Sequence, residues 1–269
     1  MVEVRRRVPT GGARVVLGLV LSYVGLLLLV PLGALATTVL GQLGEVVRTL
    51  ASEEALHAMG LTLVVAAACV TLNGIFGVVG AIVLVRHRFW GRRLLDALVD
   101  LPLALSPVMT GLAFLLLFGR TGYLRPVLEV LGIQVAFAWP GVLLATLFVT
   151  LPFTLREVAL LLEELGDTEE QAAATLGATP WQTFWRVTLP NVRPGLVLGT
   201  TLTLARALGE FGAVLVVGGA VAGKTNTATT FIHGAVEERQ EPAAFGMALI
   251  LAAAAVCMLL VLQTKRRKK

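Results

Sequence analysis

The sequence predicts an all-α membrane protein with six transmembrane helices, and two observations carry this prediction. Hydrophobic residues make up 57% of the chain and charged residues only 14%, with a mean hydropathy of +0.85. Soluble domains contain about 45–50% apolar and about 25% charged residues. The apolar residues also gather in runs of about 20, the length that a helix needs to cross a bilayer. A chain of 269 residues has room for one membrane domain of this kind.

The six apolar runs follow one another along the chain with more polar loops between them. The first run follows Arg5, Arg6 and Arg7 as the core of a signal peptide would, but it is too long for one. We therefore expect a retained membrane anchor. The expected spans are residues 15–40, 60–85, 97–118, 136–155, 192–217 and 243–262.

The basic residues orient these spans, because cytoplasmic loops of membrane proteins carry an excess of Lys and Arg. With the N-terminus inside, 16 of the 22 basic residues fall in cytoplasmic segments, five in outer loops, and Arg206 within a span. Both termini are therefore expected in the cytoplasm. The expected parts are a cytoplasmic segment 1–14, a transmembrane domain 15–262 with a long cytoplasmic loop 156–193, and a basic tail 263–269.

The long cytoplasmic loop carries start and stop signals for two short helices. Asp167 or Thr168 can cap the first helix, with Glu170 or Gln171 returning the capping bond three positions later. Gly177 can then end this helix in the left-handed conformation that glycine adopts without strain.

The second helix begins with Thr179, Pro180 and Gln182, which supply a cap, a favoured first-turn proline and a second capping box. Three aromatic residues at i, i+3 and i+4 share one face of this helix. That face either packs on the chain's own helix ends and the lipid interface, or fits a groove on a soluble partner. The three aromatic residues are Trp181, Phe184 and Trp185.

The same loop resembles the cytoplasmic signature of membrane subunits of bacterial ATP-binding-cassette importers: Glu-Ala-Ala, three residues, Gly, nine residues, Ile, one residue, Leu-Pro. Gln171 stands where that family has glutamate, and Val187 where it has isoleucine. In that family the segment is a coupling helix that docks on the ATPase subunit. The resemblance thus implies a type I importer permease fold and an ATPase-coupling role for Gln171, Ala172, Ala173, Gly177, Trp181, Phe184, Trp185 and Pro190.

Longer stretches resemble the sulfate and thiosulfate branch of that family, in particular its second, W-type membrane subunit. They include "DLPLALSPVMTGL" from Asp100, "GATPWQTFWRVTLPN" from Gly177 and "ARALGEFGAVLVVGG" from Ala205, and the likeness covers residues 60–262. It implies a multi-pass protein of the bacterial cytoplasmic (inner) membrane, surrounded by lipid, with no cofactor and no nucleic-acid partner. It also implies two ATPase copies, a paralogous permease subunit or second copy, and an extracytoplasmic anion-binding protein.

A second pattern, formed by Gly218, Gly223, Lys224 and Thr225, matches the nucleotide-binding motif G-x-x-x-x-G-K-[ST]. That motif functions between a strand and a helix. Here the preceding apolar run is expected to be a membrane helix, and the loop is expected outside the cell. We therefore interpret the match as coincidental.

Charged residues inside a span indicate contact with protein or water, because each would cost roughly 2.5–3.5 kcal/mol if it faced lipid at the bilayer centre. Arg206 and Glu210 continue a stripe with Gly199 and Thr203 at spacings of 4, 3 and 4, one helix face. The pair is either a structural ion pair or, with Thr203, part of a substrate route in which Glu210 partly neutralises Arg206.

Two prolines, Pro102 and Pro107, are expected to break the third span, where Ser106 and Thr110 can bond the freed backbone groups. We expect this break either as a plain kink or as part of the same route. Two smaller expectations concern small residues. Gly195 and Gly199 form a helix contact face of the GxxxG type, and Cys69 and Cys257 are core residues rather than metal ligands or a disulfide.

Three classes of function remain. The first is a permease subunit without chemistry of its own, for sulfate or thiosulfate, or alternatively for molybdate or tungstate because those permeases share the "RALGEFGA" phrase. The second is a self-contained anion transporter, which usually has more ionisable groups within its spans. The third is a membrane enzyme, but no nucleophile with a base, metal cluster or catalytic carboxylate pair is evident.

Overall fold

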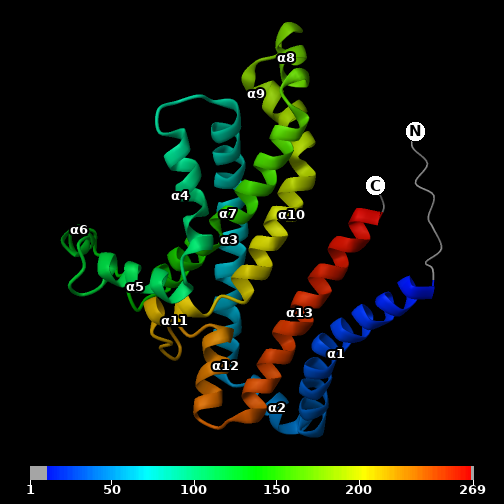
Figure 1. The fold of residues 1–269 in the computed structure, drawn as a ribbon. Helices are drawn as coiled ribbons and strands as arrows, with labels where there is room; N and C mark the ends of the chain where they lie inside the picture. Colours follow the sequence, from blue (N-terminus) through cyan, green and yellow to red (C-terminus); the bar gives the residue numbers. More distant parts are fainter. Residues whose placement is uncertain (1–10, 268–269) are drawn as a thin grey trace.

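The computed structural model describes residues 11–267, and this part of the chain is helical with no β-strand. Figure 1 shows the helices as an elongated bundle with one short helical hairpin beyond it. The elements are α1 (Gly11–Gly41), α2 (Leu43–Leu50), α3 (Glu53–Arg86), α4 (Arg92–Ala104), α5 (Pro107–Phe118), α6 (Arg125–Leu131), α7 (Trp139–Leu165), α8 (Thr168–Thr175), α9 (Pro180–Thr183), the π-helical turn η1 (Phe184–Thr188), α10 (Leu189–Leu208), α11 (Gly212–Gly218), α12 (Ala228–Glu237) and α13 (Glu241–Arg267).

Four helices, α1, α3, α7 and α13, are each long and apolar enough to cross a membrane, and two bent pairs raise the number to six. The six expected spans are therefore present. The predicted break in the third span is confirmed, because α4 and α5 meet at 115°. The expectation of an unbroken fifth span is wrong, because the helical stretch Pro180–Leu208 meets α11 at 55°. The end of α7 also lies further along the chain than expected, at Leu165.

The third span breaks at Pro107 and not at Pro102. Pro102 lies inside α4, whereas Leu105 and Ser106 are extended and Pro107 occupies the first turn of α5. A residue before proline is pushed out of the helical region, and the proline has no N–H to continue the ladder of hydrogen bonds. The chain therefore starts a new helix in a new direction.

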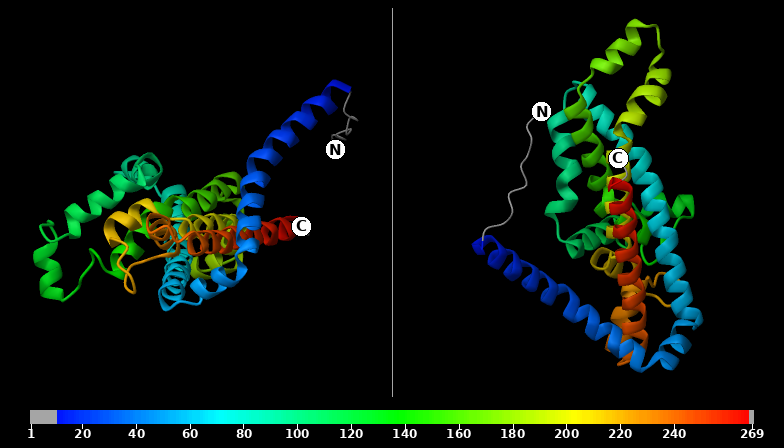
Figure 2. Two further views of the ribbon diagram at one scale, coloured as in Figure 1. Left: turned by 90° about the horizontal axis from the view of Figure 1, so that it is seen from below. Right: turned by 90° about the vertical axis from the view of Figure 1, so that its right-hand side faces the viewer.

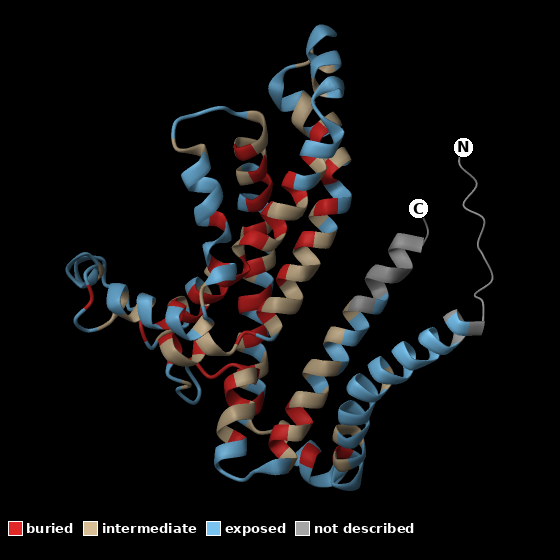
Figure 3. Cartoon of the chain, in the orientation of Figure 1, coloured by how far each residue is buried: buried red, intermediate tan, exposed pale blue. Residues whose placement is uncertain are grey.

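The centre of the bundle is formed by α3, α7 and α10, where the buried residues are concentrated (Figure 3). The expected contact face of α10 is confirmed. A Cβ on Gly195 would lie 2.6 Å from the carbonyl oxygen of Glu157, and one on Gly199 would lie 2.6 Å from the Cα of Thr154. The absence of side chains at these two positions lets the backbones of α7 and α10 touch.

Hydrogen bonds between buried polar side chains also join these three helices. Asn73 of α3 donates to the hydroxyl of Thr150 at 2.8 Å, and the hydroxyls of Thr154 and Thr203 lie 3.0 Å apart between α7 and α10. Such groups are costly in an apolar interior unless they are paired. They therefore fix the rotation of each helix relative to its neighbours.

The first helix lies apart from this centre. None of the apolar window of α1 is buried, and both views of Figure 2 show α1 projecting away from the rest of the bundle. An apolar surface of this size marks contact with lipid or with another protein. The expectation for the cysteines is half confirmed, because Cys69 is buried but Cys257 is exposed on α13.

We predict that Gly199→Ala lowers the free energy of unfolding by about 1–3 kcal/mol, the usual cost of overpacking a tight contact. The added methyl group would meet the backbone of α7, which has no flexible atom to move. Gly60→Ala in α3 is the matched control, because no atom lies within 4 Å of the new Cβ. Thermal unfolding in detergent compares the two variants, and equal midpoints would contradict the proposed contact.

Candidate functional site

The expected hairpin of two short helices is confirmed, and it projects beyond the bundle (Figure 1). Gly177 follows α8 with φ +85°. Its N–H donates to Ala174, and the N–H of Ala178 donates to Ala173, both at 3.0 Å. This pattern is the Schellman motif, which satisfies carbonyl groups at a helix end and fixes a sharp turn.

The predicted cap of α8 is wrong in its hydrogen bonds. Asp167 occupies the N-cap position, but its side chain makes no capping bond. Glu170 does not return one either, because Arg86 and Thr188 bind its carboxylate. Acidic residues in the first turn still favour the helix through its dipole.

The predicted cap of the second helix is confirmed. Thr179 Oγ1 accepts from the N–H of Gln182, and Gln182 Oε1 accepts from the N–H of Thr179, so both bonds of the capping box are present. One feature was not predicted: the chain passes into α10 through the π-helical turn η1, a rare geometry that is frequent at functional sites.

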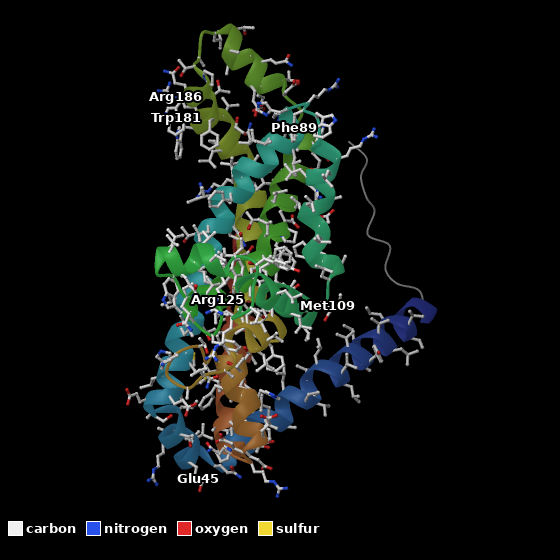
Figure 4. All side chains as sticks on the ribbon, turned by 90° about the vertical axis from the view of Figure 1, so that its left-hand side faces the viewer. Glu45, Phe89, Met109, Arg125, Trp181 and Arg186 are labelled. Carbon is white, nitrogen blue, oxygen red and sulfur yellow. The ribbon has the colours of Figure 1, made fainter. Side chains whose placement is uncertain are left out.

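The three aromatic rings contact one another, with centroids 5.2–6.0 Å apart: Trp181 stacks on Phe184, and Trp185 meets both edge to face. They line one end of an apolar groove of about 840 Å³ between α3 and α10. Phe184 packs against the core there, which agrees with the first of the two readings of this face. Trp181 and Trp185 keep 69% and 51% of their surface exposed, and Figure 4 shows Trp181 beside Arg186 on the flank of the hairpin.

The tip of the hairpin carries an exposed apolar side chain that we did not single out. Leu176 is 88% exposed at the turn between α8 and α9, and no residue of α8 is buried. The only signal in the sequence was a leucine beside the predicted turn glycine. Exposed apolar tips of this kind are typical of contact surfaces.

The second group of candidate residues lies at the opposite end of α10. Arg206 NH1 and Glu210 Oε2 are 2.7 Å apart, with Glu210 buried and Arg206 about a third exposed. Glu210 Oε1 also accepts from the N–H of Ala213 at 3.0 Å, so it caps α11 at the 55° bend. The structural reading of this pair therefore has a second contact to support it.

The stripe that we expected along α10 is interrupted. Helix α10 ends at Leu208, so Glu210 lies beyond it. Gly199 and Thr203 are buried and face α7 rather than an open surface. Of the four residues in the stripe, Arg206 is the one with substantial exposure in this conformation.

The polar residues at the break of the third span also differ from expectation. The Thr110 N–H donates to the Ser106 carbonyl at 3.0 Å, but the Ser106 side chain makes no capping bond. The Thr110 hydroxyl is buried and has no hydrogen-bond partner among the described residues. The new helix direction, rather than these side chains, accommodates the freed backbone groups.

A charged cluster between α4 and α7 was not predicted, because we placed Arg156 in a loop. Its guanidinium bonds both carboxylate oxygens of Asp100 at 2.7 Å and one oxygen of Asp96 at 2.6 Å. All three side chains are 30–52% exposed. This cluster holds the broken third span against the central helices.

The interpretation of the nucleotide motif as coincidental is supported. Helix α11 precedes the loop, where a phosphate loop would follow a strand. Thr225, the residue that would approach a magnesium ion, donates instead to the carbonyl of Gly218 at 2.7 Å and is buried. Its hydroxyl stabilises the loop itself.

Known membrane transport proteins have sequences similar to this chain. The profile of the family described as binding-protein-dependent transport system inner membrane component matches residues 73–266. The sulfate transport system permease protein CysW of Synechococcus elongatus is 44% identical over 236 residues, 87% of this chain and 82% of that protein. The corresponding CysT protein of Escherichia coli K12 is 40% identical over 265 residues, 98% and 95% of the two chains.

A similar fold occurs in a solved structure. The crystal structure of a bacterial ABC transporter involved in the import of the acidic polysaccharide alginate superimposes with a TM-score of 0.77 over 95% of both chains. The identity is 16%, so this likeness concerns the fold alone.

We predict that Glu210→Ala lowers the melting temperature of the protein more than Glu210→Gln does. The amide of glutamine keeps an acceptor for the Ala213 N–H, whereas alanine removes both this cap and the partner of Arg206. Loss of a cap alone costs about 0.5–2 kcal/mol. Glu237→Gln, an exposed change, is the control. Equal melting temperatures for all three variants would rule out a structural role of the carboxylate.

Proposed function

The chain belongs to the family of binding-protein-dependent transport system inner membrane components, and we propose that it carries sulfate and thiosulfate as a permease subunit of an ATP-driven importer. The identity of 40–44% with sulfate permeases over most of the chain supports this substrate most directly. A further CysW protein, from Synechocystis, is 50% identical over 204 residues, which favours the W-type subunit. The chain is a multi-pass inner-membrane protein, and ATP is hydrolysed on a separate subunit.

The chemistry of sulfate explains why such a subunit needs both a polar route and an external motor. Sulfate is a strongly hydrated dianion, and an unpaired charge in hydrocarbon is too costly to cross unaided. Two arginines within the spans have their charge balanced inside the chain, because Arg156 pairs with Asp96 and Asp100 and Arg206 pairs with Glu210. Net import therefore needs work from ATP that is delivered mechanically to these helices.

The hairpin is the contact that we assign to the ATPase. Gln171, Ala172 and Ala173 lie on α8, and Gly177 shapes the turn that presents Leu176. The exposed helix and its apolar tip have the form of a helix that docks in a groove. Phe184 packs against the core, Trp181 and Trp185 line the groove between α3 and α10, and Pro190 lies in the first turn of α10.

The assembly that follows has two ATPase copies, a second permease subunit that is a paralogue or another copy of this chain, and an external anion-binding protein. The uncovered α1 offers one surface for lipid or for the second permease subunit. Both termini lie in the cytoplasm in this arrangement. The N-terminal end of α1 and the C-terminal end of α13 point toward the side of the bundle that carries α8 (Figure 1). This direction supports the proposed orientation.

The anion route passes Arg206 in our proposal. One nitrogen of its guanidinium faces Glu210, and no hydrogen bond within the described chain uses the other donors. A guanidinium with free donors matches a tetrahedral oxyanion, and partial neutralisation by Glu210 prevents the dianion from being held too tightly. Thr203 and Thr110 are buried here, whereas Ser106 is exposed, so the two threonines contribute to the route only when α5 and α11 move apart.

The transport assignment predicts that vesicles with the assembled importer and external binding protein accumulate radiolabelled sulfate only when ATP is inside. Unlabelled thiosulfate should compete, whereas molybdate and tungstate should not. Strong competition by molybdate or tungstate would assign those oxyanions to the chain instead. Uptake by this chain without its ATPase would contradict the whole proposal.

For the route, we predict that Arg206→Gln lowers sulfate uptake about tenfold or more, since a hydrogen bond to a charged group contributes about 1.5–3 kcal/mol. Arg206→Lys should keep part of the activity because the charge remains. Arg239→Gln, in an outer loop, is the control. Gel filtration verifies that each variant stays assembled. Unchanged uptake by an assembled Arg206→Gln importer would exclude this arginine from the route.

A further inference from the structure

The attachment of α8 to the membrane helices is unusual for a part that must transmit force. No residue of α8 is buried, so apolar packing does not hold it. A cavity of about 320 Å³ separates the hairpin from the end of α3, between Arg86 and Ile82 on one side and Pro180 and Phe184 on the other. A load on α8 would bend the loops around this cavity unless specific bonds crossed it.

One guanidinium makes three hydrogen bonds at this point, and one of them reaches α8. Arg86, in the last turn of α3, donates from Nε to Glu170 Oε2 at 2.9 Å, from NH1 to the carbonyl of Leu162 at 3.0 Å, and from NH2 to the carbonyl of Gly166 at 2.6 Å. The two carbonyl groups belong to the end of α7, where helical partners are missing and a cation is favoured. Arg86 therefore joins α3, α7 and α8 at one point.

The carboxylate of Glu170 extends this connection to η1 and α10. Its Oε1 accepts from the hydroxyl of Thr188 at 2.8 Å, and Thr188 is the last residue of η1, directly before α10. A parallel hydrogen bond joins Asn191 of α10 to Glu169. Thus all three helices of the bundle centre are tied to the first turn of α8 by charged or polar groups.

Burial makes these bonds stiffer than ordinary surface ion pairs. The side chains of Arg86 and Glu170 are only 18% and 22% exposed. Partial burial strengthens a charge-assisted hydrogen bond, and the planar guanidinium fixes the direction of each of its donors. A lysine at position 86 would keep the charge but could not bond three acceptors in one plane.

We propose that Arg86, Glu170 and Thr188 form the mechanical joint of the importer, through which displacement of α8 by the ATPase moves α3, α7 and α10 together. The three are positioning residues that touch neither substrate nor nucleotide. This inference rests on the proposed function of the hairpin. We expect a specific defect when the joint is weakened. ATP is still hydrolysed, but the hairpin then moves relative to the membrane helices, so that less sulfate is transported for each ATP.

The test measures sulfate uptake and ATP hydrolysis on the same purified importer in vesicles. Glu170→Gln removes the charge at nearly constant shape, Thr188→Val removes one donor, and Arg86→Lys removes the planar fork. We expect each variant to assemble with its ATPase and to hydrolyse ATP at about the wild-type basal rate. The ratio of sulfate moved to ATP hydrolysed should fall at least threefold in Glu170→Gln and less in Thr188→Val.

Two comparisons separate a joint from a merely structural contact. Glu164→Gln and Arg88→Lys change exposed charges close to the joint that have no bond in the described chain, and they should keep the wild-type ratio. The double variant Arg86→Lys with Glu170→Gln should be little worse than the worse single variant, because both act through one connection. Assembled variants with the wild-type ratio would overturn the joint. The joint would also be overturned if Glu170→Gln failed to assemble while Thr188→Val kept the wild-type ratio of sulfate moved to ATP hydrolysed.

A separate measurement keeps this result distinct from failure of the proposed function. Leu176→Asp places a charge on the hairpin tip without touching the joint, and it should prevent co-purification of the ATPase. If Leu176→Asp binds the ATPase normally, the hairpin is not the docking element. If it loses the ATPase while the joint variants keep both the ATPase and the wild-type ratio, the docking proposal stands and the joint is wrong.

Discussion

The backbone contact between α7 and α10 is the constraint on which the other parts depend. Gly195 and Gly199 allow it, and the hydrogen bond between Thr154 and Thr203 fixes its register. Because α10 is held this firmly, its two ends have a fixed relation to each other. One end receives the hairpin through η1, and the other leads to the bend at Glu210. A movement of the hairpin therefore reaches the level of Arg206 through a single helix.

The membrane bundle and the hairpin are held by opposite kinds of interaction. The bundle is held by apolar packing and by small residues, which stay firm in lipid because nothing competes for the contact. The hairpin stands outside this packing and is held by charged and polar bonds that are shielded from water only in part. This division suits a subunit whose membrane helices must keep their shape while an exposed helix exchanges contacts with a separate motor.

Local features were predictable from the sequence, and long-range ones were not. The capping box at Thr179 and the turn at Gly177 depend on residues within five positions, so their patterns sufficed. The 115° bend was foreseeable as a break but not as an angle, because packing against α7 and α11 sets the new direction. The bond between Arg86 and Glu170 joins residues 84 positions apart, and the local capping pattern around Glu170 carries no information about so distant a partner.

The central claim is that α8 and the central helices of one subunit move as one body. The most direct measurement is the distance between spin labels at Thr175→Cys on α8 and Arg88→Cys beyond α3, in an assembled importer with Cys257→Ser to remove the exposed cysteine. Our account predicts one narrow distance distribution that is the same with and without bound ATP, while the distance between the α8 helices of the two permease subunits changes. A distribution that broadens or shifts within one subunit on ATP binding would contradict it.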